Sequence, residues 1–114
     1  MKLASLKSGG RDGTLVVVSR DLSRAARAAA APTLQAALDD WDRCSPLLSA
    51  LAQALEKDQV EDAFDLSVSD LSAPLPRAYQ FLDGSAYLAH VERVRRARGA
   101  EMPPSFLTDP LMYQ

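Results

Sequence analysis

The sequence has very few side chains that bind metals or carry redox chemistry. Its 114 residues include one cysteine, Cys44, and one histidine, His90. A single cysteine excludes an intramolecular disulfide and a site built from several thiolates, and a single histidine excludes a cluster of imidazole ligands. We interpret Cys44 as structural, because a free cysteine usually packs as a small apolar side chain. A reducing, cytoplasmic location fits this cysteine content.

Strong net charge and long apolar segments are also lacking. The net charge is -2, which gives no general attraction to nucleic acid or to anionic membranes. No apolar run is long enough to cross a bilayer, and residues 1–7 lack the apolar block of a secretory signal. We therefore expect neither a nucleic-acid partner nor a membrane partner. The apolar fraction of 47% and the charged fraction of 25% are typical of a soluble globular domain.

The first third of the chain predicts antiparallel strands. Residues 2–7 form a short candidate strand, residues 8–13 contain three glycines that favour a turn, and residues 14–19 (TLVVVS) form the best strand candidate. These segments together predict a β-hairpin. Residues 20–23 predict a second turn. The alanine-rich residues 24–31 are ambiguous between helix and strand, and we favour a short third strand at a sheet edge.

The next segment predicts a helical hairpin. Thr33 is a plausible N-cap for a first helix. Ser45 and Pro46 predict the start of a second helix, because serine at the N-cap and proline at the first helical position are both favoured. Apolar residues at helical spacing would form the buried stripe of this second helix: Leu47, Leu48, Leu51, Ala54 and Leu55.

The remaining pattern completes an α+β fold class. Residues 64–69 alternate apolar and polar side chains, which predicts a half-buried strand. Two prolines in residues 74–76 fix an extended segment, and residues 77–82 predict a further strand or extended run. We expect a small antiparallel β-sheet or hairpin packed on the helical hairpin, followed by a C-terminal helix and an extended tail.

The C-terminal helix is predicted around the only histidine. Ser85 can act as its N-cap, and Gly99 lies where a helix commonly ends. His90 falls on the same helical face as the apolar residues of this segment: Tyr87, Val91 and Val94. A lone histidine on an apolar face is more often a packed core residue than a catalytic one, so this pattern alone leaves both interpretations open.

One cluster of basic residues follows the histidine. It consists of Arg93, Arg95, Arg96 and Arg98. Such a cluster can bind phosphate or nucleic acid, but arginine near the end of a helix also complements the helix dipole. The aromatic residues on which single strands stack are not interleaved here. We favour the structural interpretation.

Several segments, taken in order, resemble a known family. They are MKLASL, GTLVVVSRDL and APTLQAALDDW in the first part of the chain, and then PLPRAYQFLDGSAYLAH and GAEMPPSFLTDPLMYQ. This series is similar to the fumarylacetoacetate hydrolase family, in particular to bacterial members with a short N-terminal domain before the catalytic one. The resemblance implies an N-terminal domain over residues 1–76. It implies that residues 77–114 are the first segment of a truncated catalytic domain.

The resemblance also implies a function. Members of this family are cytoplasmic, homodimeric metalloenzymes that hydrolyse C–C bonds in 1,3-diketo acids, as in aromatic amino-acid catabolism, and relatives decarboxylate or isomerise similar acids. By resemblance, Asp83 would bind Mg²⁺ or Ca²⁺, His90 would be the general base, and Tyr113 would contact the substrate. The implied partners are the catalytic domain of the same protein, a second copy and a small diketo acid.

The sequence departs from the family pattern after the histidine. The family supplies further metal ligands there, a Glu-x-Glu pair and a later aspartate, but this sequence contains no Glu-x-Glu. A glutamate three residues after the histidine in some relatives is Arg93 here. A single carboxylate does not hold Mg²⁺ usefully, so we predict that the isolated chain binds no metal and is inactive. An alternative is a stand-alone dimerising or regulatory interaction module, in which the helix around His90 meets a partner chain.

Overall fold

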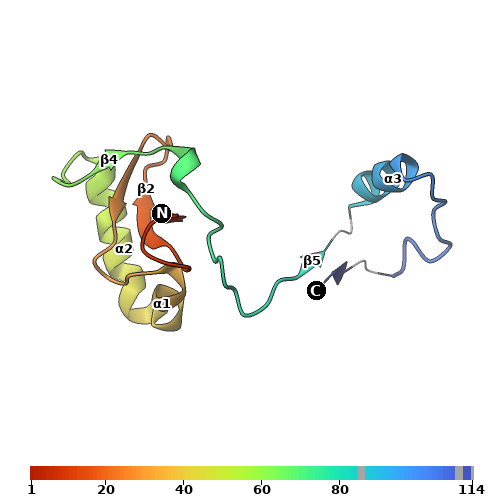
Figure 1. Cartoon of the computed structure of the whole chain (residues 1–114), viewed down its shortest axis with the longest axis horizontal. Helices are drawn as coiled ribbons and strands as arrows, with labels where there is room; N and C mark the ends of the chain where they lie inside the picture. Colours follow the sequence, from red (N-terminus) through yellow and green to blue (C-terminus); the bar gives the residue numbers. More distant parts are fainter. Residues whose placement is uncertain (85–86, 110–111, 114) are drawn as a thin grey trace. The chain divides into compact units, whose positions relative to one another are not determined.

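The computed structural model describes residues 1–84, 87–109 and 112–113, and the chain divides into two units, Met1–Ala78 and Tyr79–Gln114. The first unit combines a sheet with two helices (Figure 1). Its elements are β1 (Lys2–Leu6), β2 (Thr14–Val18), β3 (Arg24–Arg27), α1 (Leu34–Asp39), α2 (Trp41–Glu56), β4 (Phe64–Asp65) and the 3-10 helix η1 (Val68–Asp70). The predicted α+β class is confirmed.

The sheet of the first unit is antiparallel and has the strand order β1-β2-β3-β4. Strand β2 is central, with Val17 opposite Leu3 of β1 and Ala26 of β3. Leu15 and Val17 belong to the core on one face of the sheet, and Val16 and Val18 to a second cluster on the other. Because β2 is buried on both faces, it is a continuous apolar run and does not alternate.

The helices α1 and α2 supply the main core. Cys44, Leu48 and Leu55 of α2 are buried and pack with sheet residues including Leu15 and Ala26. The small alanines of β3 let the helix approach the sheet closely. Cys44 is fully buried, with its Sγ 3.6 Å from the carbonyl oxygen of Ala30. Its predicted structural role is confirmed.

The start of the second helix differs from the prediction. Thr33 does cap α1, since its Oγ1 accepts a hydrogen bond from Ala36 N at 3.1 Å. However, α2 begins at Trp41, so Pro46 lies inside the helix and Ser45 is not its N-cap. Proline at this position cannot donate a hydrogen bond to the carbonyl of Asp42 and crowds that carbonyl, but the residue itself is exposed to solvent. Burial of the side chains on the opposite face outweighs this local loss.

The buried stripe of α2 is correspondingly shifted. Leu47, predicted to be buried, is 52% exposed, whereas Cys44 takes a place in the core. The inward-facing residues follow a spacing of four, three and four: Cys44, Leu48, Leu51 and Leu55. An earlier helix start adds one turn before the proline, and this turn brings Cys44 onto the stripe.

A segment after η1 runs along the β1 edge of the sheet, and we call residues 70–77 the strap. After β4 at one edge of the sheet, the chain crosses to the opposite edge and runs beside β1. Lys7 N donates to the carbonyl of Asp70, and Ser72 N donates to the carbonyl of Ser5, both at 2.8 Å. Leu71 forms a bridge with Leu6. The strap therefore pairs with the β1 edge of the sheet.

Two side chains fasten the strap. Ser5 is fully buried, and its Oγ donates to the carbonyl of Pro74 at 2.7 Å. Arg77 forms a two-pronged ion pair with Asp12, in which Nε lies 2.6 Å from Oδ1. The hydrogen bonds from this guanidinium lower the pKa of the Asp12 carboxyl. The strap therefore joins the end of the first unit to its first strand and first turn.

The strand predictions after α2 were too long. Of the strand predicted over residues 64–69, only the two residues of β4 form a strand, and the 3-10 helix η1 follows. Residues 77–82 contain no strand. Strand β3 pairs with β2 and with β4, so it lies inside the sheet and not at its edge. The crossing to the far edge of the sheet bends the chain and so shortens the strand.

The second unit contains β5 (Asp83–Gly84), α3 (Leu88–Ala97) and β6 (Met112–Tyr113). Helix α3 begins after Tyr87, later than an N-cap at Ser85 requires; Ser85 itself lies outside the described residues. The predicted stop at Gly99 is confirmed, because its φ is +65° and its N–H donates to Arg96 O at 3.1 Å. The tail after it forms turns up to residue 109. Among the described residues, no helix has the length and apolarity needed to cross a membrane.

Candidate functional site

Two of the predicted site residues lie on adjacent strands. Strands β5 and β6 pair antiparallel, with Asp83 directly opposite Tyr113. The side chain of Asp83 is exposed to solvent. This pairing brings the backbone of Tyr113 beside Asp83 although the two residues are far apart in the sequence.

His90 lies in the first turn of α3 and is exposed. We expected His90 to lie on a packed apolar face of this helix, and that expectation was wrong. Among the described residues of α3, only Val91 is buried, with 5% of its surface exposed. Within the described part of the chain, no hydrogen bond or ion pair orients the imidazole. The neighbouring Glu92 pairs with Arg96 at 2.7 Å and so faces along the helix. The imidazole is therefore open to water.

The donor set around Asp83 does not form a metal site by itself. Over residues 1–84, 87–109 and 112–113 there is no group of three or more His, Cys, Asp or Glu residues that could hold a metal ion. Mg²⁺ and Ca²⁺ need about six oxygen ligands, several of which are usually carboxylates. The described residues alone therefore do not complete a site for either metal, and no catalytic step through a metal follows from them.

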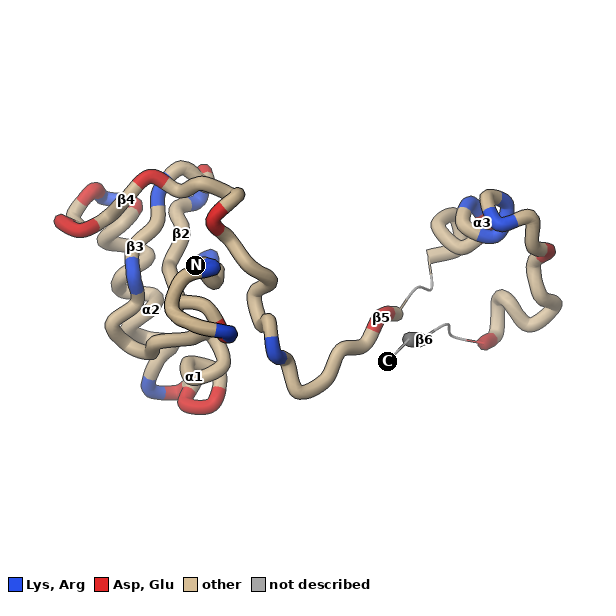
Figure 2. Tube along the Cα trace, in the orientation of Figure 1, with Lys and Arg blue, Asp and Glu red and all other residues tan. Residues whose placement is uncertain are grey.

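The arginine cluster lies on and just after α3, where Figure 2 shows the blue segments gathered. Arg96 pairs with Glu92, and Arg95 donates through Nη1 to the carbonyl of Glu101 at 2.9 Å. Arg95 and Arg96 lie in the last turn, where cations complement the helix dipole. These contacts agree with the structural interpretation, and the absence of a nucleic-acid partner stays a prediction.

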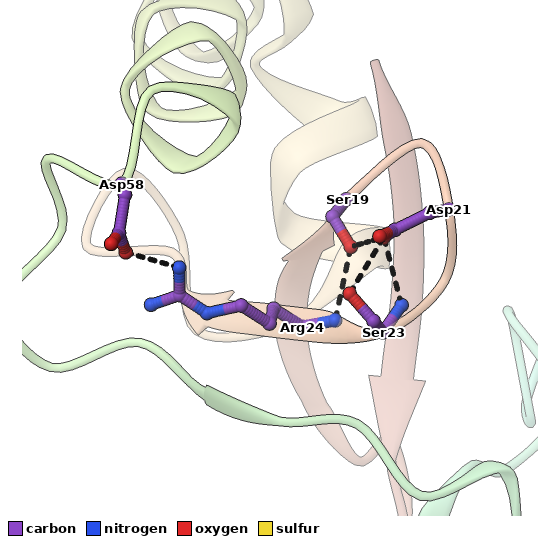
Figure 3. Close-up of polar contacts among 5 residues, drawn as sticks. All are labelled: Ser19, Asp21, Ser23, Arg24 and Asp58. Atoms are coloured by element: carbon purple, nitrogen blue, oxygen red, sulfur yellow. Dashed lines mark hydrogen bonds and ion pairs between the residues drawn. The ribbon is translucent and has the colours of Figure 1, made fainter.

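A polar cluster that the sequence pattern did not reveal holds the turn between β2 and β3 (Figure 3). The carboxylate of Asp21 accepts hydrogen bonds from Ser19 Oγ at 2.6 Å, Ser23 Oγ at 2.7 Å and Ser23 N at 3.0 Å. These hydrogen bonds lower the pKa of Asp21 to about 2, and the one from Ser19 has the largest effect. The signal for this turn in the sequence is an aspartate followed two residues later by serine. We call this cluster the turn clamp.

The turn clamp is tied to the end of α2. Arg24 of β3 pairs with Asp58 (Figure 3), and Arg20 N donates to Glu56 Oε1 at 2.7 Å. Asp58 has a φ of +56° and closes α2, with Asp58 N bonded to Leu55 O at 3.2 Å. All these groups satisfy one another, and the cluster holds no histidine or cysteine. It positions the turn and is not a catalytic arrangement.

The first unit also has an apolar cavity of about 450 Å³ on the sheet face opposite the helices. We call it the sheet groove. Its rim includes Leu22, which is 51% exposed, and Val68, which is 72% exposed. Its lining is mostly apolar and comprises Lys2, Leu3, Ala4, Val18, Leu22, Leu66, Val68, Leu71, Ser72 and Pro74.

Comparison with known families concerns this first unit. Residues 1–77 match the family model described as fumarylacetoacetase N-terminal domain 2. The chain belongs to this family. The resemblance seen in the sequence is thereby confirmed for the N-terminal domain. No curated protein matches the chain.

The match to the fumarylacetoacetase N-terminal domain family ends close to a structural boundary. It stops at Arg77, and the first unit ends at Ala78. The four-stranded sheet, helices α1 and α2, the strap, the turn clamp and the sheet groove therefore lie within the family domain. Asp83, His90 and Tyr113 all lie beyond it.

Proposed function

We propose that the chain is the N-terminal part of a fumarylacetoacetase-type hydrolase, a metal-dependent enzyme that cleaves a C–C bond in 1,3-diketo acids. In this proposal the first unit is an accessory domain, and residues 77–114 begin the catalytic domain. The observation that carries the proposal is the family match over residues 1–77. Asp83 and His90 follow it directly at the seven-residue spacing that the resemblance requires.

The proposed roles follow from the chemistry of three side chains. Asp83 would supply one carboxylate oxygen to Mg²⁺ or Ca²⁺. A divalent cation, when bound, polarises the oxygens of a diketo acid. His90 would take a proton from water at an imidazole nitrogen, for which its exposure leaves room. Tyr113 would contact the substrate, and its backbone pairing with Asp83 supports this role. The other metal ligands would come from outside the described residues.

The gene sequence downstream of Gln114 tests the proposal directly. An in-frame continuation with a Glu-x-Glu pair and a later aspartate supports it. A stop codon at that point contradicts it and favours the stand-alone interaction module, for which the sheet groove is the specific observation.

The isolated chain gives a second test. With a 1,3-diketo acid such as an acylpyruvate and Mg²⁺, we expect no loss of the enol absorbance, because Asp83 is a single ligand. Metal-dependent turnover by this chain alone would show that its site is complete and that our proposal is wrong. In a protein that includes the continuation, Asp83→Asn and His90→Ala should each reduce kcat by at least ~100-fold. Asp109→Asn, a change at another exposed aspartate of the second unit, is the matched control.

A further inference from the structure

A second cavity of the first unit lies where the start of β1 and the end of β2 meet the C-terminal half of α2. Its volume is about 370 Å³, which falls within the range of small-molecule sites. Val18 and Ala52 supply apolar parts of its wall. Met1 also lines it, with its Sδ 3.7 Å from Ser49 Oγ on α2. The cavity therefore has an apolar wall beside the polar groups described next.

Two charged side chains of this cavity hold the backbone of Arg20 between them. Lys2 Nζ donates to Arg20 O at 2.5 Å, and Arg20 N donates to Glu56 Oε1 at 2.7 Å. Both partners are neutral backbone groups, so neither bond cancels a charge. An ammonium has three N–H donors and a carboxylate two oxygens. Lys2 and Glu56 therefore each keep their charge and further hydrogen-bonding capacity at the cavity.

Arg20 adds a second cation to the lining. Its side chain is exposed, and its guanidinium makes no hydrogen bond or ion pair within the part of the chain that the structure describes. The planar fork of a guanidinium matches the two oxygens of a carboxylate. Gln53 lines the same cavity with an amide that can both donate and accept. The cavity thus presents two cationic groups and one anionic group beside an apolar wall.

We propose that this cavity binds a free α-amino acid with an apolar side chain. The carboxylate of the ligand meets Arg20 and Lys2, its ammonium meets Glu56, and its side chain lies against Val18 and Ala52. A ligand with only a negative charge leaves Glu56 opposed to it, and a ligand with only a positive charge is repelled by the two cations. A zwitterion is the class of ligand that matches all three charged groups.

The exposure of the cavity sets the strength of binding. Ion pairs that remain in contact with water contribute little each, and a small ligand makes few contacts. The dissociation constant for an amino acid such as leucine is therefore roughly millimolar. This inference uses no residue beyond Glu56 and does not depend on the proposed catalytic function.

Titration of the full 114-residue chain with leucine, followed by amide NMR spectra, tests the site. We expect saturable shifts at the amides that surround the cavity, those of Val18, Arg20 and Gln53 among them. Two analogues separate the charges of the ligand. 4-Methylpentanoate lacks the ammonium and should bind at least ~3-fold more weakly than leucine, and 3-methylbutylamine lacks the carboxylate and should bind at least ~10-fold more weakly.

Two variants test the partners of those charges. Arg20→Gln should weaken leucine binding at least ~3-fold, because it removes the guanidinium. Glu56→Gln keeps an oxygen that can accept from Arg20 N but loses the charge. It should weaken leucine binding and leave 4-methylpentanoate bound at least as tightly as in the wild type, since the opposing charge is gone.

Arg11→Gln and Glu61→Gln are the matched controls, because both residues are exposed and neither lines the cavity. They should leave the dissociation constant of leucine unchanged, and the dispersion of the same spectra checks that each variant is folded. Three results each overturn the proposal. They are the absence of saturable shifts around the cavity at about 50 mM leucine, equal affinity of the wild type for leucine and 4-methylpentanoate, and undiminished leucine binding by folded Arg20→Gln.

Discussion

The two units of the chain differ sharply in what they bury. Among the described residues, fifteen apolar residues are buried, and all but Val91 lie in the first unit. The second unit instead exposes many large apolar side chains: Tyr79, Phe81, Leu82, Tyr87, Leu88, Met102 and Leu107. Ordering a residue costs about 1–2 kcal/mol of backbone entropy, which burial must offset. The first unit has the core of an independent domain, whereas the second needs further cover.

The largest expected effect comes from separating the units. A peptide of residues 1–78 should unfold cooperatively in urea, with the circular dichroism of a mixed α/β domain. A peptide of residues 79–114 should show no cooperative transition, because its burial is too small for its length. A sigmoidal unfolding curve for the second peptide would remove the contrast between the units.

The next effect compares two leucines on one helix. Leu48→Ala should lower the free energy of unfolding by about 2–5 kcal/mol, because Leu48 is fully buried between helix and sheet. Leu47→Ala, one residue away and 52% exposed, should change it by no more than about 0.5 kcal/mol. Urea unfolding of the full chain measures both. Equal losses would mean that the stripe of α2 is not the one described.

A smaller effect is expected at the strap. Ser5→Ala removes the hydrogen bond to the carbonyl of Pro74 and should cost about 1–2 kcal/mol. Amide exchange of Ser72, whose N–H donates to Ser5 O, should speed up more than that of Val17 in the centre of the sheet. Ser67→Ala is a control, because Ser67 is exposed and its hydroxyl bonds only to that of Ser69 among the described residues. Equal acceleration at Ser72 and Val17 would show that the strap does not open separately.

The smallest effect is the dependence of stability on pH at the turn clamp. The pKa of Asp21 is lowered from 3.8 to about 2 in the folded chain. Its contribution to stability is therefore fully present above pH 3.8 and is lost as the pH falls toward 2. Asp21→Asn should flatten the fall in urea stability between pH 5 and pH 2.5. Part of the loss of stability at low pH should remain in this variant, because the pKa of Asp12 is also lowered. An unchanged slope in Asp21→Asn would exclude a role for this carboxylate in stability.

Local signals in the sequence predicted much of the secondary structure. The run TLVVVS indicated β2 because a central strand needs apolar side chains on both faces. Thr33 and Gly99 indicated helix ends because their effects on the backbone are local. Pro46 misled the prediction, since the rule for proline at a helix start does not take account of burial on the far side of the helix. Long-range packing decided that position.

The strap and the site were less accessible to prediction. Nothing in the sequence near Leu71 reveals that it bridges Leu6, because that contact depends on the whole path of the chain over the sheet. The exposure of His90 likewise depends on which side of α3 is covered. Asp83 and Tyr113 were identified by resemblance, and their pairing in β5 and β6 is a long-range feature that spacing does not predict.

The strap has a consequence for how the protein is made. Its hydroxyl–carbonyl hydrogen bond joins residues 69 positions apart, and Leu6 and Leu71 are nearly as distant in sequence. Contacts of such long range form late, because a large loop must close first, and they therefore make folding slower. During synthesis, β1 leaves the ribosome well before the strap, so its outer edge stays unpaired until residues 70–72 have emerged. The nascent chain therefore carries an open strand edge until the strap is made, a period in which pairing with other chains competes with folding.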